Sequence, residues 1–107
     1  MRIVEFHRFL NDNNALRVRF EVERGQVLKF VVQLECHFGD DEAWMPVIRY
    51  DTAHGFAHCD KLYPYEPIIK TKMETKGHNE ALNVAMNDLV DNWSKYRRRY
   101  EEWLRSK

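Results

Sequence analysis

One short segment, residues 49–60, holds the side chains best suited to chemistry in this sequence. It reads Arg-Tyr-Asp-Thr-Ala-His-Gly-Phe-Ala-His-Cys-Asp and contains two of the chain's five histidines. Imidazole rings transfer protons near neutral pH, a carboxylate can orient such a ring, and a guanidinium can hold a phosphate through paired hydrogen bonds. Together these groups are the parts of a metal-independent phosphodiester transfer, with base, acid and anion clamp.

We assign His54 and His58 to the exchange of protons, and Asp51 or Asp60 to the orientation of one of the two rings. Arg49 is assigned to the negative charge that develops on the phosphate. The strand that precedes this segment would fix one part of the set, while the loop that follows could fold over a substrate.

Two other interpretations of this segment stay open. Its side chains could form a solvated turn with local ion pairs, which contribute little stability. Alternatively His54 and His58, with Asp60 or Asp51, could supply nitrogen and oxygen ligands to a metal ion. The turn residues between the two histidines argue against a helix that would align them, and no third histidine follows at an expected interval. The prediction is therefore a site without a metal or other cofactor.

The run Arg49-Tyr50-Asp51, then Ala53-His54-Gly55, then His58-x-Asp60, resembles the central motif of TumE-type toxins from prokaryotic toxin–antitoxin systems. TumE-type toxins are taken to be ribonuclease-like growth inhibitors that a partner antitoxin holds in check. The resemblance covers chiefly residues 49–60. It implies RNA as the substrate, a cognate antitoxin as partner, and an active site that includes Arg49, Asp51, His54 and His58.

A second candidate surface is the basic run at residues 95–100, where four cations are interleaved with two tyrosines. Lys95, Arg98 and Arg99 could line a phosphate backbone, and they are the predicted nucleic-acid contacts. The same cations also suit a solvated helix end, because the macrodipole favours positive charge there and nearby glutamates can pair with them.

The first half of the chain predicts strands, because apolar residues recur at every second position. Leu16, Val18, Phe20 and Val22 share one strand face, and Leu28 begins a longer set that runs to Phe38 on the next strand. Turn-forming residues at 11–14, 24–26 and 39–42 join the strands into an antiparallel meander. In the fourth strand, Trp44 to Asp51, Pro46 cannot donate a ladder hydrogen bond and therefore predicts an edge or a bulge.

Residues 52–77 lose this period and are predicted to be rich in loops, with one further strand near residues 68–72. The helix that follows is predicted to start near Asn79, whose side chain could cap it. Apolar residues spaced four and three apart form its seam, and aromatic residues in such a seam favour packing on a sheet over a partner helix. The seam residues are Leu82, Met86, Leu89, Trp93, Tyr96, Tyr100 and Trp103.

The predicted fold is α+β, an antiparallel meander sheet of four to five strands packed against one long C-terminal helix. A chain of 107 residues, 44% of them hydrophobic, suits one domain over residues 1–107 and excludes general disorder. Within it we predict a meander over 1–51, a loop-rich segment over 52–77 and a helix over 78–106.

The charges balance, with 17 Lys and Arg against 17 Asp and Glu, so no overall field recruits nucleic acid or a membrane. No apolar run approaches the roughly 18 residues that cross a bilayer, and no secretory signal is present, so we predict a cytoplasmic protein without membrane contact. The predicted function is a small toxin-like, metal-independent ribonuclease. The alternative is a non-enzymatic interaction module that forms homodimers through the aromatic seam of the helix.

Overall fold

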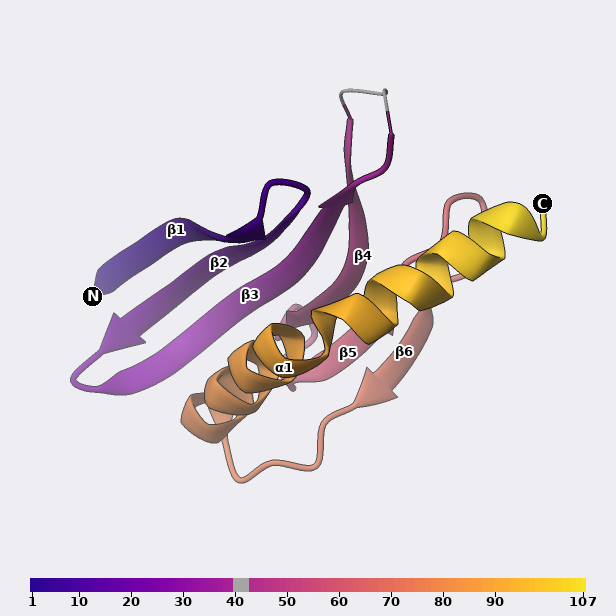
Figure 1. Ribbon diagram of the computed structural model, residues 1–107. Helices are drawn as coiled ribbons and strands as arrows, with labels where there is room; N and C mark the ends of the chain where they lie inside the picture. Colours follow the sequence, from indigo (N-terminus) through magenta and orange to yellow (C-terminus); the bar gives the residue numbers. More distant parts are fainter. Residues whose placement is uncertain (40–42) are drawn as a thin grey trace.

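The sheet and helix form the predicted α+β architecture (Figure 1). The computed structural model describes residues 1–39 and 43–107, so most of the predicted turn at 39–42 lies outside the described residues. A six-stranded antiparallel sheet runs in chain order from β1 to β6, and α1 crosses one of its faces (Figure 1). The elements are β1 (Arg2–Asn11), β2 (Asn14–Glu23), β3 (Gln26–His37), β4 (Trp44–Asp51), β5 (His58–Lys61), β6 (Ile69–Lys72) and α1 (His78–Arg105).

The sheet has more strands than the four to five that were predicted. β6 confirms the strand expected near residues 68–72, but β5 falls inside the segment predicted to be rich in loops. The cause is the composition of β5, His-Cys-Asp-Lys, whose buried positions are filled by His58 and Asp60. A period-two pattern of apolar residues cannot reveal a strand whose buried side chains are polar.

Register shifts explain two details of the strand predictions. Pro46 lies beside a shift between Leu34 and Glu35 of β3, as the predicted bulge requires, although β4 is an internal strand. The prediction for Leu28 is wrong, since this side chain is 45% exposed. A shift between Glu21 and Val22 pairs Val22 with Val27, and this local bulge displaces Leu28 from the buried row.

The helix packs on the sheet, as its apolar seam predicts. Leu89 and Tyr100 of α1 join the main core, with exposures of 0% and 1%. Tyr100 stacks between Phe38 and Tyr63, at ring-centroid distances of 5.1 and 5.8 Å. The sheet thus covers part of this seam, while Trp93 and Trp103 are only partly buried, and homodimerisation through the seam stays a prediction. In the described part of the chain, no helix combines the length and apolar character needed to span a membrane.

The helix start differs from the prediction. Gly77 occupies the N-cap position without a side-chain cap, and its φ of 143° is a conformation that favours glycine. Asn79 instead accepts a hydrogen bond from the Val27 N–H at 2.8 Å and donates one to the Gly25 carbonyl at 2.9 Å. The side chain predicted to cap the helix thus fastens its first turn to the β2–β3 turn.

A carboxylate joins the middle of the helix to the sheet. Asp88 of α1 accepts hydrogen bonds from the hydroxyl groups of Tyr50 on β4 and Tyr96 on α1, both at 2.6 Å. Asn92 donates to its other oxygen at 2.9 Å. Burial first, and then the hydrogen bond to Asp88, raises the pKa of both tyrosines well above the usual range.

We expect Asp88→Ala to lower the free energy of unfolding by about 2–3 kcal/mol, because it leaves the mostly buried Tyr50 hydroxyl without an acceptor. Urea denaturation followed by circular dichroism measures the change. Asp91→Ala is the matched control on the exposed side of the same helix, and its effect should stay within about 0.5 kcal/mol. Equal effects of the two substitutions would contradict a bridging role for Asp88.

Stability is expected to fall as the pH rises above 9. Burial raises the pKa of the Cys36 thiol from 9.0 to about 12, so the folded state retains a proton that the unfolded chain releases. The contribution of this thiol to the free energy of unfolding is complete below pH 9. It is lost between pH 9 and about 12, by about 1 kcal/mol per pH unit at first. Urea denaturation at pH 8, 9 and 10 measures this slope. Cys36→Val should reduce it to the part that comes from Cys59, whose pKa burial also raises, and an unchanged slope in that variant would exclude Cys36 as a source.

Candidate functional site

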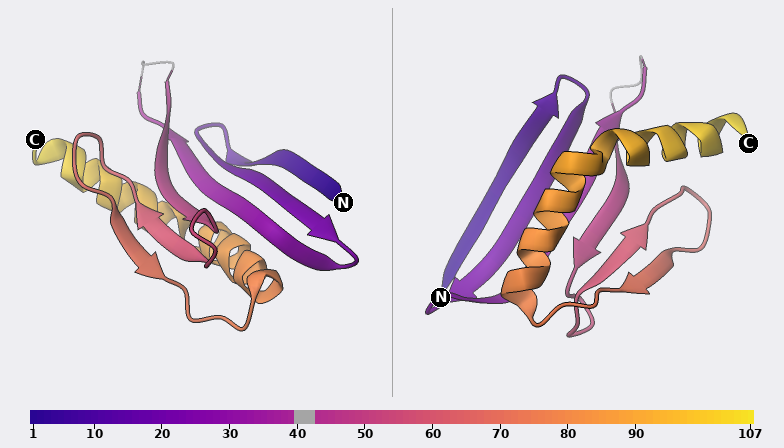
Figure 2. Two further views of the ribbon diagram at one scale, coloured as in Figure 1. Left: turned by 180° about the vertical axis from the view of Figure 1, so that it is seen from behind. Right: turned by 60° about the horizontal axis from the view of Figure 1, so that its bottom comes forward.

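The helix leaves one face of the sheet uncovered (Figure 2, left). The strand register places most of the predicted catalytic residues on this face. Tyr50 of β4 reaches the helix, so its neighbours Arg49 and Asp51 belong to the opposite face. β5 pairs with β4 so that His58 lies opposite Asp51, and Asp60 lies opposite Arg49. Antiparallel pairing therefore places four of the five predicted residues on one patch of the uncovered face.

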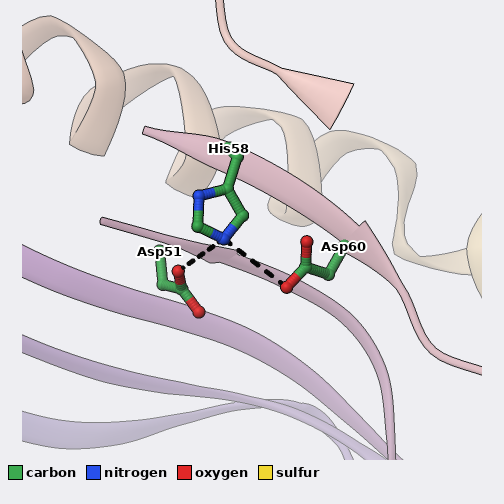
Figure 3. Close-up of side chains that lie close together, drawn as sticks. All are labelled: Asp51, His58 and Asp60. Atoms are coloured by element: carbon green, nitrogen blue, oxygen red, sulfur yellow. Dashed lines mark ion pairs between the residues drawn. The ribbon is translucent and has the colours of Figure 1, made fainter. Parts of the chain in front are cut away.

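Three of these residues form a compact cluster, the Asp51–His58–Asp60 cluster (Figure 3). The Nε2 atom of His58 lies 2.8 Å from an Asp51 oxygen and 3.5 Å from an Asp60 oxygen. His58 is 0% exposed, Asp51 7% and Asp60 3%. Two almost completely buried carboxylates thus share one buried imidazole. The prediction that Asp51 or Asp60 orients a histidine agrees with this geometry, since both contact the same ring.

The other nitrogen of His58 identifies its tautomer. Nδ1 lies 3.2 Å from the Phe56 carbonyl oxygen, which can only accept a hydrogen bond, so Nδ1 carries a proton. Nε2 is fully buried, and no acceptor among the described residues lies in line for a hydrogen bond from it. Close contact with carboxylate oxygens without hydrogen-bond alignment is therefore the unusual feature of this cluster.

The loop from Thr52 to Ala57 covers the cluster. Asp51 accepts a hydrogen bond from the Ala53 N–H at 3.1 Å, and the Gly55 N–H donates to the Thr52 carbonyl at 3.0 Å. Gly55 has a φ of 84°, which glycine adopts without strain and which turns the loop back over β5. The turn predicted from this glycine is confirmed, and no helix forms between the two histidines.

His54 lies on the outside of this arrangement. The His54 ring stacks on the His58 ring at a centroid distance of 5.6 Å, and the Phe56 ring contacts the His58 ring at 5.5 Å. His54 is exposed, whereas His58 is completely buried. The prediction that both imidazoles exchange protons with a substrate therefore needs correction, because only His54 can touch one. His58 could affect a substrate only through its neighbours.

Two lysines of β6 complete the site, and neither was predicted from the sequence. Lys70 contacts the two oxygens of Asp60 at 3.0 and 3.3 Å, and the Lys72 ammonium lies 5.9 Å from the Phe56 ring centroid. They lie opposite Asp60 and His58 in the β5–β6 ladder. The predicted strand at 68–72 already placed both lysines on one face, but only the register shows which residues they meet.

A hollow of about 280 Å³ opens beside the cluster. Asp51 forms part of its wall, and Arg19 and Lys29 bring positive charge to it. Both cations are bound to Glu21, at 2.9 and 3.1 Å, and their hydrogen bonds hold the pKa of that carboxyl below its usual value. The hollow is an open space beside the cluster that could admit an anionic group.

Arg49 is on the same face but does not join the cluster. Its Nε donates to the side chain of Gln33 at 2.8 Å, and it lines a separate hollow with Pro64 and Ile68. Among residues 1–39 and 43–107, no ion pair links its guanidinium to Asp60, although the two residues are paired across the strands. A role for Arg49 in holding phosphate stays a prediction.

The basic run of the helix lies across the sheet from the cluster. Arg97 is structural: it donates to the Asn14 side chain at 2.7 Å and the His37 carbonyl at 3.0 Å. Lys95 and Arg99 lie over the Tyr96 ring, 5.6 and 5.4 Å from its centroid, and Arg98 is exposed. The structure therefore does not bring the predicted nucleic-acid contacts together with the predicted catalytic residues.

Comparison with protein families gives a match over nearly the whole chain. Residues 1–106 match the model of a family described as Domain of unknown function (DUF7718). The chain belongs to the DUF7718 family. The DUF7718 description assigns no activity, so the resemblance to TumE-type toxins stays a prediction. No match was found among curated proteins or among solved structures.

Proposed function

We propose that this DUF7718 chain is a small RNA-cleaving enzyme of the toxin–antitoxin kind. The observation that carries the proposal is the exposed imidazole of His54, stacked on a buried imidazole that two carboxylates surround. An exposed, oriented imidazole beside cationic side chains is what a phosphodiester transfer at neutral pH requires. The motif that resembles TumE-type toxins supports RNA as the substrate.

In this proposal His54 takes the proton from the ribose 2′-hydroxyl group, whose oxygen attacks the neighbouring phosphate. The bond from phosphorus to the 5′-oxygen breaks, and this leaving oxygen takes its proton from water. His58 is a positioning residue, since its stacked ring fixes His54 while Asp51 and Asp60 hold it from below. Lys72 lies opposite His58 in the β5–β6 ladder and supplies positive charge for the phosphate, whereas Lys70 is paired with Asp60. The reaction needs no metal to generate its base, because His54 serves that purpose.

The test compares RNA with DNA of the same base sequence. Purified protein is incubated with each single strand, once with a chelator and once with added Zn²⁺ or Mn²⁺. We expect cleavage of RNA only, with 2′,3′-cyclic phosphate ends, because DNA lacks the 2′-hydroxyl group that attacks. Cleavage of neither strand under any of these conditions, or equal cleavage of both, would contradict the proposal.

A role in binding another protein chain is supported by a separate observation. This observation concerns the edge of the sheet and not the helix seam. β1 pairs only with β2, and it exposes Ile3 and Phe9, at 51% and 66%. A long, exposed edge strand with apolar side chains is a template for pairing with another chain. This edge is where we expect an antitoxin or a second copy of the chain to bind.

The edge-strand interaction predicts a change in oligomeric state. If the chain forms homodimers through β1, Phe6→Asp on this strand should convert them to monomers, which light scattering after size-exclusion chromatography would measure. Val84→Asp is the control, because this side chain is exposed on α1, away from the edge. A monomeric wild-type chain would leave the antitoxin as the expected partner of β1, and a dimer that Phe6→Asp does not disturb would exclude the edge.

A further inference from the structure

We propose that the Asp51–His58–Asp60 cluster binds one divalent first-row transition-metal ion, such as Zn²⁺ or Mn²⁺. One donor atom from each residue lies within 4.8 Å of the others, and all three residues are buried (Figure 3). One imidazole nitrogen and two carboxylate oxygens form a mixed donor set that suits these ions. The inference revises the prediction of a site without metal, and it does not depend on RNA cleavage.

The tautomer of His58 is the first argument. Because Nδ1 gives its proton to the Phe56 carbonyl, a neutral ring presents the lone pair of Nε2 to the two carboxylates. Such an arrangement of three electron-rich atoms repels itself unless a cation lies among them. A backbone carbonyl on the second ring nitrogen is also the usual support of a metal-binding histidine, since it fixes the ring and the tautomer.

The alignment of the contacts distinguishes a metal ion from a proton. A proton on Nε2 would neutralise the cluster, but it would have to lie on the line to an acceptor, and neither carboxylate oxygen is so placed. Bonds of about 2.1 Å to one metal ion separate its donor atoms by roughly 3.0–3.4 Å. The distances from Nε2 to the carboxylates, 2.8 and 3.5 Å, lie on either side of that range.

Lys70 is the internal competitor for this site. Its ammonium contacts both oxygens of Asp60 and is partly exposed, so it can withdraw toward solvent when a cation binds. If Lys70 instead stays beside Asp60, the charges of the ammonium group and the divalent ion together exceed those of the two carboxylates. An anionic ligand can neutralise this excess positive charge. Asp51 borders the hollow of about 280 Å³, from which water or a phosphate oxygen could reach a coordination position that the protein leaves open.

The experiment measures metal binding by the whole chain in the absence of RNA. The protein is treated with a chelator and desalted, and Zn²⁺ or Mn²⁺ alone is then titrated by calorimetry. We expect one ion per chain. We also expect the melting temperature to rise on the order of 10 °C at a hundredfold excess over Kd. Failure to bind either ion would overturn the proposal.

Variants locate the ion. Asp51→Asn keeps the size of the side chain and should weaken binding on the order of 100-fold or more, while His54→Ala should leave it unchanged, since His54 is not a ligand. Lys70→Met should strengthen binding by about tenfold or more, because it removes the competing charge. This last result would not arise from adventitious binding to surface histidines.

Each remaining outcome is decisive. If circular dichroism shows that Asp51→Asn does not fold, Asp60→Asn provides the same measurement. Binding that survives both substitutions, or that His54→Ala abolishes, would overturn the proposed ligand set. Metal binding without RNA cleavage would contradict the proposed function alone, and RNA cleavage by a chain that binds no metal would contradict this inference alone.

Discussion

Replacing His58 by leucine is expected to lower the free energy of unfolding by about 3–5 kcal/mol, even though leucine is the more hydrophobic residue. The reason is the pair of carboxylates that remain. Asp51 and Asp60 are 7% and 3% exposed, so without the cation that the imidazole helps to hold they would repel each other in a poorly solvated site. Urea denaturation at pH 7, with and without chelator, measures the loss.

A matched control and a rescue separate this effect from simple loss of packing. His54→Leu changes the same residue type on the exposed side of the stack, and its effect should stay below about 1 kcal/mol. Adding Asp51→Asn to His58→Leu removes one of the opposed charges, and should recover about 1–2 kcal/mol. If the second substitution lowers stability further, charge repulsion is not the cause.

The substitution with the largest expected effect on activity is His54→Ala. On the proposed function, it should slow RNA cleavage by roughly 10²–10⁴-fold, the usual contribution of a general base. The fold should be retained, because His54 is exposed and its ring contacts within the described part of the chain are limited to Phe56 and His58. Single-turnover cleavage of a labelled RNA, with circular dichroism of each variant, measures both quantities.

His7→Ala is the control for His54→Ala. His7 is an exposed strand histidine, paired with Arg17 at the far edge of the sheet, and it should not affect cleavage. A similar loss in both variants would indicate a general effect of histidine on RNA binding. Full activity of His54→Ala would remove the proposed base and leave the buried cluster as a structural feature.

The elements with regular apolar periods could be predicted from the sequence. Leu16 and Val18 mark the buried face of β2, and the seam from Leu82 to Trp103 predicts both the helix and the face that it buries. The predictions fail where the register of a strand shifts locally or where polar side chains are buried. A single bulge exposes Leu28, and β5 buries a histidine and an aspartate in positions where a core strand is expected to carry apolar residues.

The sequence predicts which segment carries the site residues, but it does not predict how their side chains lie relative to one another. The residue types at 49–60 single out Asp51, His58 and Asp60, but nothing in their order shows that both carboxylates turn to the same ring. That relation depends on the register of β4 with β5. Lys70 and Lys72 lie at the site because of the register between β5 and β6, which no local sequence pattern predicts.

The Asp51–His58–Asp60 cluster is built from a single hairpin, β4, its connecting loop and β5. Only a few residues of chain separate its three members, so closing the hairpin assembles them at little cost in loop entropy. The helix and the β1 edge contribute none of the three side chains. The hairpin can therefore be grafted as a unit into another antiparallel sheet, carrying its histidine and both carboxylates with it.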